Sequence, residues 1–177
     1  DLIIIHAFLK STRKTPAKQA RQAIAIYQML DSLKTERWGK QPALPNEDIV
    51  DKTLSLELLS DAKEGSIQNS RLYFPFFSTK PALSEGVTNY LKDIVTWMKL
   101  NPENVIMLTG HTDNIGNKQA NLALGIRLVM VIRELLIKNG APMSQIEIMS
   151  RGESQPIADN STEQGRLKNR RVEISPM

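Results

Sequence analysis

The sequence predicts an α/β fold whose elements follow the order β-α-β-α-β-β from about residue 70, with hairpin strands before them. Short apolar runs rich in strand formers alternate with longer segments in which apolar residues recur every three or four positions, as on the buried side of a helix. Gly, Pro and Asn mark the boundaries between these segments. The length of 177 residues suits one domain with an appendage, and 41% hydrophobic with 24% charged residues is an ordinary globular composition.

The N-terminal part differs from the rest of the chain. Residues 16–37 carry apolar side chains on a helical period and predict an N-terminal helix, and Gly39 with two following prolines indicates a linker. We therefore expect residues 1–45 to form a basic helical appendage with its linker, and residues 46–177 to form a single domain.

Two strands are predicted before the first long helix of this domain. From Asp51, leucines alternate with polar residues, which is typical of a half-buried strand. Residues 72–77 form the second strand, where a proline indicates an edge or a bulge, and residues 61–65 form the hairpin loop between the two. Ser84 is then a favourable N-cap for a helix that stops at Asn101.

Residues 104–129 carry the most information and predict a buried strand, a sharp turn and an amphipathic helix. The helix ends near Asn139, and its predicted apolar stripe consists of Leu124, Leu128, Val131, Ile132 and Leu135. Polar side chains gather where the strand meets the helix, namely His111, Thr112, Asp113 and Asn121. An open α/β sheet tends to hold its ligand in such a crevice.

The C-terminal part completes the predicted order of elements. The pattern there predicts a strand at 145–149, a polar loop at 151–162, a short helix at 163–168 and a final strand at 171–174. No internal repeat or low-complexity tract interrupts this order.

The charge distribution argues against nucleic acid as a partner. The formal net charge is +4, and eight Lys and Arg residues lie within the first 40 positions. A nucleic-acid reader usually combines such a stripe with aromatic residues or a recognition motif, and neither is present. The basic segment is thus either a solvated face or a contact for acidic lipid head groups or an acidic protein.

The sequence shows neither a membrane-spanning segment nor a cysteine. No apolar run approaches the roughly 20 residues of a membrane helix. The chain begins at Asp1 without a methionine, so a leader that is not part of this sequence remains open. No lipidation cysteine is visible, which fits equally a protein that is never lipidated and a lipoprotein whose acylated residue precedes Asp1.

Catalytic and metal-binding interpretations lack the residues that they need. The histidines are His6 and His111, and no third ligand near His111 and Asp113 suggests a metal site. No nucleophile motif and no phosphate-binding glycine loop occurs. We expect no enzymatic activity and no cofactor or metal.

Two motifs resemble those of OmpA-like domains, the family of peptidoglycan-associated lipoproteins and of the periplasmic domains of flagellar stator proteins. GHTDNIG followed by NLALGIR is similar to the family pattern G-H-T-D-x-x-G and N-x-x-L-S-x-R-R-A. GRLKNRRVE near the C-terminus is similar to G-R-x-x-N-R-R-V-E. The resemblance covers roughly residues 70–175 and implies an α+β sandwich, with a mixed sheet and helices on one face.

The resemblance also implies a ligand, the diaminopimelate of a peptidoglycan stem peptide, which carries an ammonium and a carboxylate on one carbon. Asp113 would hold the ammonium, although it could equally be a structural cap at the start of the helix. Arg170 and Arg171 alternate faces on a strand, so we expect one in the crevice and the other in a surface ion pair. The implied ligand-binding residues are Thr79, Asp113, Asn121, Arg127, Arg170 and Arg171.

Two departures from the family pattern replace charge with apolar surface. The family usually has two adjacent arginines at positions 127 and 128, the second of which is credited with gripping the ligand carboxylate, and here the pair is Arg127-Leu128. Phe77 stands where the family tends to have an aspartate. Losing a charge-assisted contact costs about 1.5–3 kcal/mol, which is enough to abolish weak binding.

Two functions in the periplasm of a Gram-negative bacterium, next to its outer membrane, follow from these observations. The first is a non-enzymatic anchor that holds an outer-membrane or envelope-spanning complex to peptidoglycan. The alternative is a structural subunit of a large envelope machine, such as a type IV secretion core complex. Its OmpA-like fold would have lost the ligand through Leu128 and Phe77 and would contact protein subunits instead. A wall hydrolase is a third class, for which no catalytic constellation is present.

Overall fold

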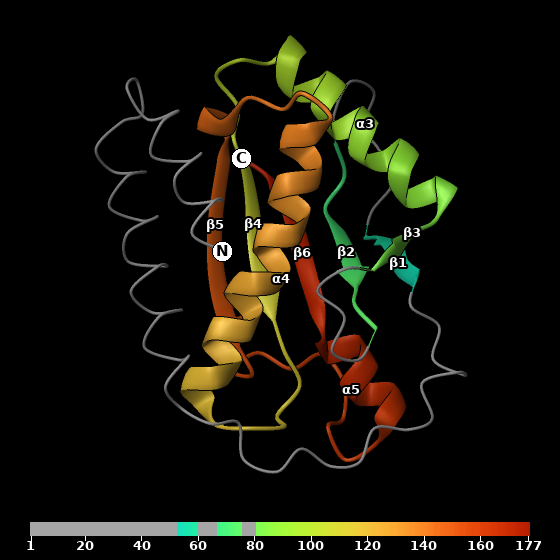
Figure 1. Cartoon of the computed structure of the whole chain (residues 1–177), viewed down its shortest axis with the longest axis vertical. Helices are drawn as coiled ribbons and strands as arrows, with labels where there is room; N and C mark the ends of the chain where they lie inside the picture. Colours follow the sequence, from blue (N-terminus) through green and yellow to red (C-terminus); the bar gives the residue numbers. More distant parts are fainter. Residues whose placement is uncertain (1–52, 60–66, 76–80) are drawn as a thin grey trace. The chain divides into compact units, whose positions relative to one another are not determined.

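The computed structural model describes residues 53–59, 67–75 and 81–177, drawn in colour in Figure 1. All of them belong to one compact unit of the chain, Pro42–Met177. The expected N-terminal helix and linker, the hairpin loop and the candidates Thr79 and Phe77 lie outside the described residues. Within the described ranges, no helix is both long and apolar enough to cross a bilayer.

The described part forms a mixed α/β fold of six strands, three α-helices and one short 3-10 helix, which confirms the predicted fold class. In chain order the elements are β1 (Thr53–Leu58), β2 (Ser70–Tyr73), β3 (Ala82–Leu83), α3 (Glu85–Leu100), β4 (Ile106–His111), α4 (Lys118–Lys138), η2 (Met143–Gln145), β5 (Ile146–Gly152), α5 (Glu163–Asn169) and β6 (Arg171–Pro176).

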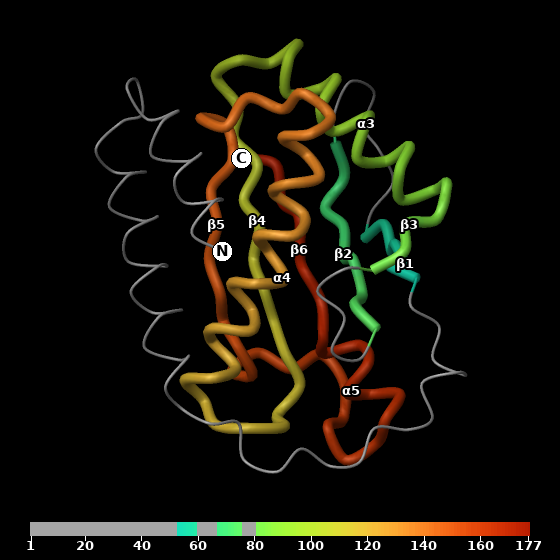
Figure 2. The backbone as a smooth tube through the Cα atoms, viewed as in Figure 1, coloured from blue at the N-terminus to red at the C-terminus, as the bar shows by residue number. Residues whose placement is uncertain are grey.

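The strands form one mixed sheet in the order β3-β1-β2-β6-β4-β5. β5 runs parallel to β4, as expected for two strands that α4 connects, whereas β6 runs antiparallel to both β4 and β2. Figure 2 shows β4 and β6 side by side along the length of the sheet. Because of these directions, the ends of β4 and β5 and the beginning of β6 lie at the same edge.

Helices α3 and α4 cover the same face of the sheet, as the resemblance implies (Figure 1). α4 packs along β4 and β5, while α3 packs against α4 and β1. The core lies between these two layers, because alternate residues of each strand point towards the helices. Its fully buried members include Leu54, Leu72, Leu91, Ile94, Met98, Ile106, Leu108, Ile132, Leu136 and Ile174.

The apolar stripe of α4 lies further round the helix than the sequence predicted. Leu128 and Ile132 are buried as expected, but Leu124, Val131 and Leu135 are only partly buried. Two glycines explain the difference: a Cβ on Gly110 would lie 2.1 Å from the carbonyl oxygen of Gly125, so helix and strand meet at a distance that only glycine permits. The residues that this approach buries beside them are Val129 and Leu136.

The local boundary signals are mostly confirmed. Ser84 caps α3 by accepting a hydrogen bond of 3.3 Å from the backbone N–H of Val87. α4 ends at the predicted position, and Gly140 follows it with a φ of 92°. β2 ends at Tyr73 rather than at residue 77: the backbone N–H of Phe74 still donates to the carbonyl of Arg170, but Pro75 has no N–H with which to continue the ladder. The two-residue strand β3 and helix η2 were not predicted.

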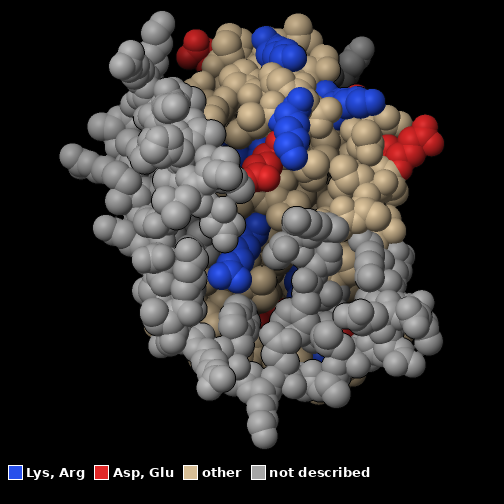
Figure 3. All heavy atoms as spheres, viewed as in Figure 1, with Lys and Arg blue, Asp and Glu red and all other residues tan. Residues whose placement is uncertain are grey.

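Charged side chains do not form a continuous strip on the described part of the face that α3 and α4 build. Figure 3 shows Lys and Arg at separate points of this face, with other residues between them.

Candidate functional site

The polar residues singled out in the sequence meet at the edge of the sheet where β4 ends and β6 begins. His111, the last residue of β4, is paired in register with Arg171, the first residue of β6. Arg170 lies one residue before the start of β6, and Asp113 lies two residues after the end of β4. Their side chains form an ion pair of 2.8 Å between Nη1 and Oδ2, and each residue is only 5% exposed.

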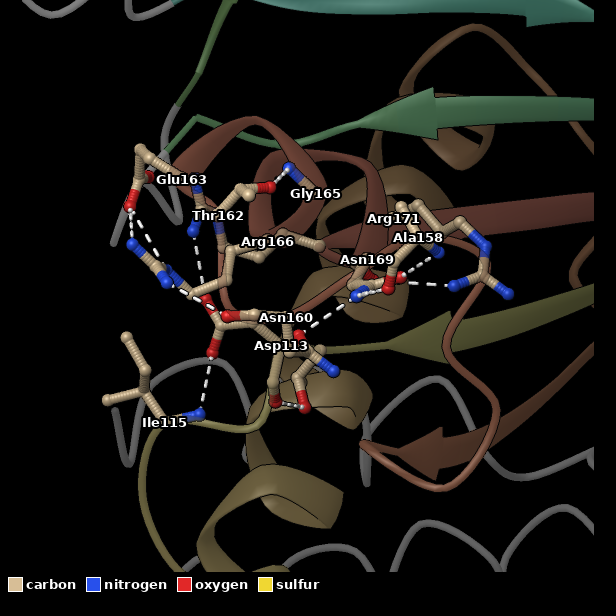
Figure 4. A network of polar contacts seen from close by, with 12 residues as sticks. Asp113, Ile115, Ala158, Asn160, Thr162, Glu163, Gly165, Arg166, Asn169 and Arg171 are labelled. Carbon is tan, nitrogen blue, oxygen red and sulfur yellow. Dashed lines mark hydrogen bonds and ion pairs between the residues drawn. The ribbon is translucent and has the colours of Figure 1, made fainter.

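Asp113 also organises the turn that leads into α4. Its Oδ1 accepts a hydrogen bond of 3.1 Å from the backbone N–H of Ile115, which Figure 4 shows beside it. The N-cap of α4 is Asn117, whose side chain accepts from Ala120. Asp113 is therefore not the helix cap that the sequence left open, but it does fix the turn before the helix while Oδ2 faces Arg170.

Arg170 contacts a second carboxylate, which belongs to the short helix α5. Its Nη2 lies 3.1 Å from Oε1 of Glu163, and Oε2 of the same carboxylate lies 2.7 Å from Nη2 of Arg166. Partial burial raises the pKa of Glu163, but the hydrogen bonds from Arg166 and Arg170 outweigh it, so the pKa is lowered overall. Figure 4 shows Glu163 and Arg166 facing each other at this end of the sheet.

Asn121 lies in the first turn of α4, and its contact is with the loop after β5. The residue is 2% exposed, and its side-chain amide donates to the carboxylate of Glu153. The sequence left open whether Asn121 bonds to a ligand or to a loop, and in this structure it bonds to the loop.

Arg171 does not form the surface ion pair that we expected, because it is 2% exposed. Its Nε donates to Glu173 over 2.9 Å and its Nη2 donates to the carbonyl of Gln155 over 3.2 Å. The expected ion pair therefore forms with Glu173, but it is buried at Arg171 because the face of the sheet opposite α3 and α4 is not open to solvent there. The loop after β5 folds back to Arg171 and supplies the Gln155 carbonyl.

The contacts of Glu173 form a charge cluster on the face of the sheet opposite α3 and α4. Arg71 of β2 approaches Glu173 at 3.3 Å and His111 approaches it at 3.6 Å. The pKa of Glu173 is lowered to about 2, chiefly by His111 and, against the opposing effect of burial, also by Arg171. At 3.6 Å the His111 contact is longer than a hydrogen bond, so it stabilises the carboxylate only when the imidazole is protonated.

Arg127 and Leu128 lie apart from the Asp113–Arg170 pair. Leu128 is 4% exposed and belongs to the apolar core. Arg127 is half-buried, and helical geometry places it about 120° around α4 from Asn121. The structure thus pairs Asp113 with Arg170, whereas Asn121 donates to Glu153 and Arg171 donates to Glu173.

Glu163 and Glu153 are the polar residues of this site that the sequence analysis missed. A signal existed for Glu163, because it precedes Arg170 by seven residues, which is two turns of a helix. Glu153 gave no such signal, since its place depends on the path of the loop after β5. Among the described residues, no group of three His, Cys, Asp or Glu side chains could hold a metal ion.

Residues 76–170 match the OmpA family, a segment that spans more than half of the chain. The chain belongs to the OmpA family. The first motif lies within this segment and the second begins in it, and the Asp113–Arg170 pair joins one to the other.

Among OmpA-family relatives, the peptidoglycan-associated lipoprotein of Pseudomonas aeruginosa is 31% identical over 134 residues, which cover 71% of this chain and 77% of the relative. Outer membrane porin F of Pseudomonas fluorescens is 40% identical over 85 residues, or 48% of this chain and 26% of the porin. The lipoprotein of Pseudomonas putida matches over 60% of its length. The first relatives therefore extend well beyond the part that this chain matches.

A solved structure of the family has the same fold. The crystal structure of the peptidoglycan-associated lipoprotein from Burkholderia pseudomallei superposes with a TM-score of 0.56 at 28% sequence identity. The superposition covers 60% of this chain and 89% of the lipoprotein.

Proposed function

We propose that this OmpA-family domain binds peptidoglycan by holding the zwitterionic head of diaminopimelate between Asp113 and Arg170. The ion pair of 2.8 Å carries the proposal, because it places one carboxylate and one guanidinium side by side. A carbon that bears an ammonium and a carboxylate presents the complementary pair of charges. The names of the relatives, which include peptidoglycan-associated lipoproteins, support the same ligand.

Binding on this proposal is an exchange of partners. The ligand ammonium replaces the guanidinium at Asp113, and the ligand carboxylate pairs with the guanidinium of Arg170. Both protein charges are already buried and paired, so the exchange leaves no buried charge without a partner. The ligand must still be desolvated, which keeps the affinity for a single stem peptide modest.

The cellular role that fits this ligand is mechanical. We propose a periplasmic protein, associated with the outer membrane, that anchors an envelope complex to the cell wall without catalysing a reaction or using a cofactor. Protein subunits of that complex are the second class of partner. A lipid anchor outside the present sequence would give a membrane attachment.

The test is sedimentation of the protein with purified peptidoglycan sacculi. The informative variant is Asp113→Asn combined with Arg170→Gln, because it removes both charges together and leaves neither buried and unpaired. We expect the double variant to stay folded and to lose at least tenfold in sacculus binding. Equal binding by the folded double variant and the native protein would remove this site from the proposal.

A structural subunit without a ligand is the second candidate, and one observation favours it. Leu128 is 4% exposed within the core, so the position that the family uses for a ligand-gripping arginine contributes packing here. The domain would then use its surface for contacts with other subunits. A folded native protein that fails to sediment with sacculi would favour this candidate.

We further propose that residues 46–177 fold without residues 1–45. Two observations support this: Pro42–Met177 forms a compact unit of its own, and within its described part the sheet and the helices α3 and α4 share a continuous core. A fragment of residues 46–177 should show a cooperative melting transition within a few degrees of the full chain. A fragment without such a transition would make the first 45 residues part of the fold.

A further inference from the structure

We propose that Glu163 is a specificity-determining residue that competes with the ligand carboxylate for Arg170. This inference rests on the proposed function, since it concerns how the same site selects its ligand. We infer competition for Nη2 of Arg170, because Nη2 is directed to Glu163 at 3.1 Å while Nη1 is directed to Asp113 at 2.8 Å. Glu163 therefore acts as an internal substitute for the carboxylate of the ligand.

The exposure of the partners shows which of them can move. The side chains of Asp113 and Arg170 are 6% and 7% exposed, whereas the side chain of Glu163 is 63% exposed. Glu163 can turn into solvent at little cost, because a solvated carboxylate keeps its hydration. The buried guanidinium has no such alternative and needs a carboxylate in contact with it. In the exchange, Glu163 is consequently the residue that moves, and Arg170 stays in place.

A second arginine gives the displaced carboxylate a place to stay. Arg166 contacts Oε2 of Glu163 at 2.7 Å, while its Nη1 donates to the carbonyl of Asn160 at 2.8 Å. Glu163 can thus release Arg170 and keep Arg166, because its two oxygens make separate contacts with the two arginines. The release of Arg170 by Glu163 then requires the rotation of one exposed side chain.

This arrangement predicts a preference among ligands that a purely structural Glu163 would not produce. A negative charge beside Arg170 disfavours a ligand carboxylate and favours a ligand ammonium. Removing Glu163 should therefore strengthen binding of a stem peptide whose diaminopimelate carries a free carboxylate. It should not strengthen binding of the same peptide with that carboxylate converted to an amide.

The experiment is calorimetric titration of two synthetic tripeptides into the full chain. One is L-Ala–D-Glu–diaminopimelate, and the other is the same peptide with an amide in place of the diaminopimelate carboxylate on the carbon that bears the free ammonium. The variants are Glu163→Ala and Glu163→Gln, and the control is Glu103→Gln, which makes the same charge change in the exposed loop before β4, at the opposite edge of the sheet. We expect Glu163→Ala to bind the free acid about two- to fivefold more tightly, as suits a partly exposed ion pair. The amide and the control should stay within twofold of the native protein.

The outcomes separate this inference from the proposed function. Tighter binding of the free acid alone supports competition by Glu163. If the native protein binds and the Asp113→Asn, Arg170→Gln double variant does not, but Glu163→Ala leaves both tripeptides unchanged or weakens both, the competition is refuted while the function stands. An equal gain for both tripeptides also refutes it, because a general opening of the site ignores the carboxylate. Absence of binding by the native protein and by every variant refutes the function, and the competition with it.

Discussion

Arg170 and Arg171 are neighbours in the chain, are both almost completely buried, and have opposite surroundings. Arg170 lies just before β6 and faces Asp113 and the exposed Glu163 at the edge of the sheet. Arg171 begins β6 and lies on the face of the sheet opposite α3 and α4, where its guanidinium donates to Glu173 and to the carbonyl of Gln155. Arg170 therefore has one partner, Glu163, whose side chain is mostly exposed and can rotate into solvent, whereas the side chain of Glu173 beside Arg171 is mostly buried.

The difference teaches that burial alone does not separate a binding residue from a structural one. What separates the two arginines is whether a bound partner can be exchanged. Glu173 lies between two strands and is held by Arg171, Arg71 and His111. Glu163 is mostly in solvent. Substitutions at Arg171 should therefore change stability, and substitutions around Arg170 should change binding.

The largest effect is expected for Arg171→Met. The change removes a buried guanidinium and leaves Glu173 with weaker partners, and breaking a buried pair in this way typically costs about 3–5 kcal/mol. Burial already lowers the pKa of Arg171, although Glu173 opposes this, so the guanidinium depends on that carboxylate. Urea unfolding measures the loss, and Arg151→Met at an exposed position of β5 is the control. A loss below 1 kcal/mol would show that Arg171 is not the structural member of the pair.

Leu128→Arg should cost about 3 kcal/mol of unfolding free energy. The guanidinium would enter the core beside Ile132, where it cannot be solvated, and a buried charge without a partner is strongly unfavourable. Leu128→Met keeps the apolar volume and should cost less than about 1.5 kcal/mol. Thermal melting of both variants tests this. A stable arginine variant that binds the diaminopimelate tripeptide more tightly would instead show that the side chain reaches Asp113.

The Glu173 cluster should make the fold sensitive to acid in a defined window. The pKa of Glu173 is about 2 in the folded chain, against an ordinary value of 4.5, so folding favours the ionised form. Its contribution, about 2–3 kcal/mol, is complete above pH 4.5 and is lost as the pH falls towards 2. Urea unfolding between pH 7 and pH 2 should show this loss, and Glu173→Gln should flatten the profile. A profile that Glu173→Gln does not change would assign acid sensitivity to other carboxylates.

The sequence predicted the fold well because its signals are local. The N-cap at Ser84, the Asn-Gly end of α4 and the alternation of β1 all depend on neighbours within one turn or strand. The side of α4 that faces the sheet was not predictable in this way. It depends on Gly110 and Gly125, which are 15 residues apart and meet only when the helix lies on the sheet.

The candidate site was predictable in its members but not in its partnerships. The motifs brought Asp113, Asn121, Arg170 and Arg171 to attention, and the antiparallel pairing of β4 with β6 then decided which arginine meets Asp113. The alternation of side chains along a strand correctly predicted that Arg170 and Arg171 point in different directions. It did not reveal that Arg171 would be buried, because the loop that returns to it is 16 residues away in the chain.

The smallest effect is expected for Arg127→Gln, which sharpens the comparison by removing the third arginine of the expected ligand set. Arg127 is half-buried on a side of α4 about 120° from Asn121, and none of the described contacts joins it to Asp113. Losing it should change the unfolding free energy by no more than about 0.5 kcal/mol, as for an ordinary surface substitution. Sacculus sedimentation should stay within twofold of the native protein. A drop in binding as large as that of the Asp113→Asn, Arg170→Gln double variant would instead make Arg127 the residue that receives the ligand carboxylate. Arg170 would then be a structural residue like Arg171, and its buried ion pair with Asp113 would stabilise the fold and not bind the ligand.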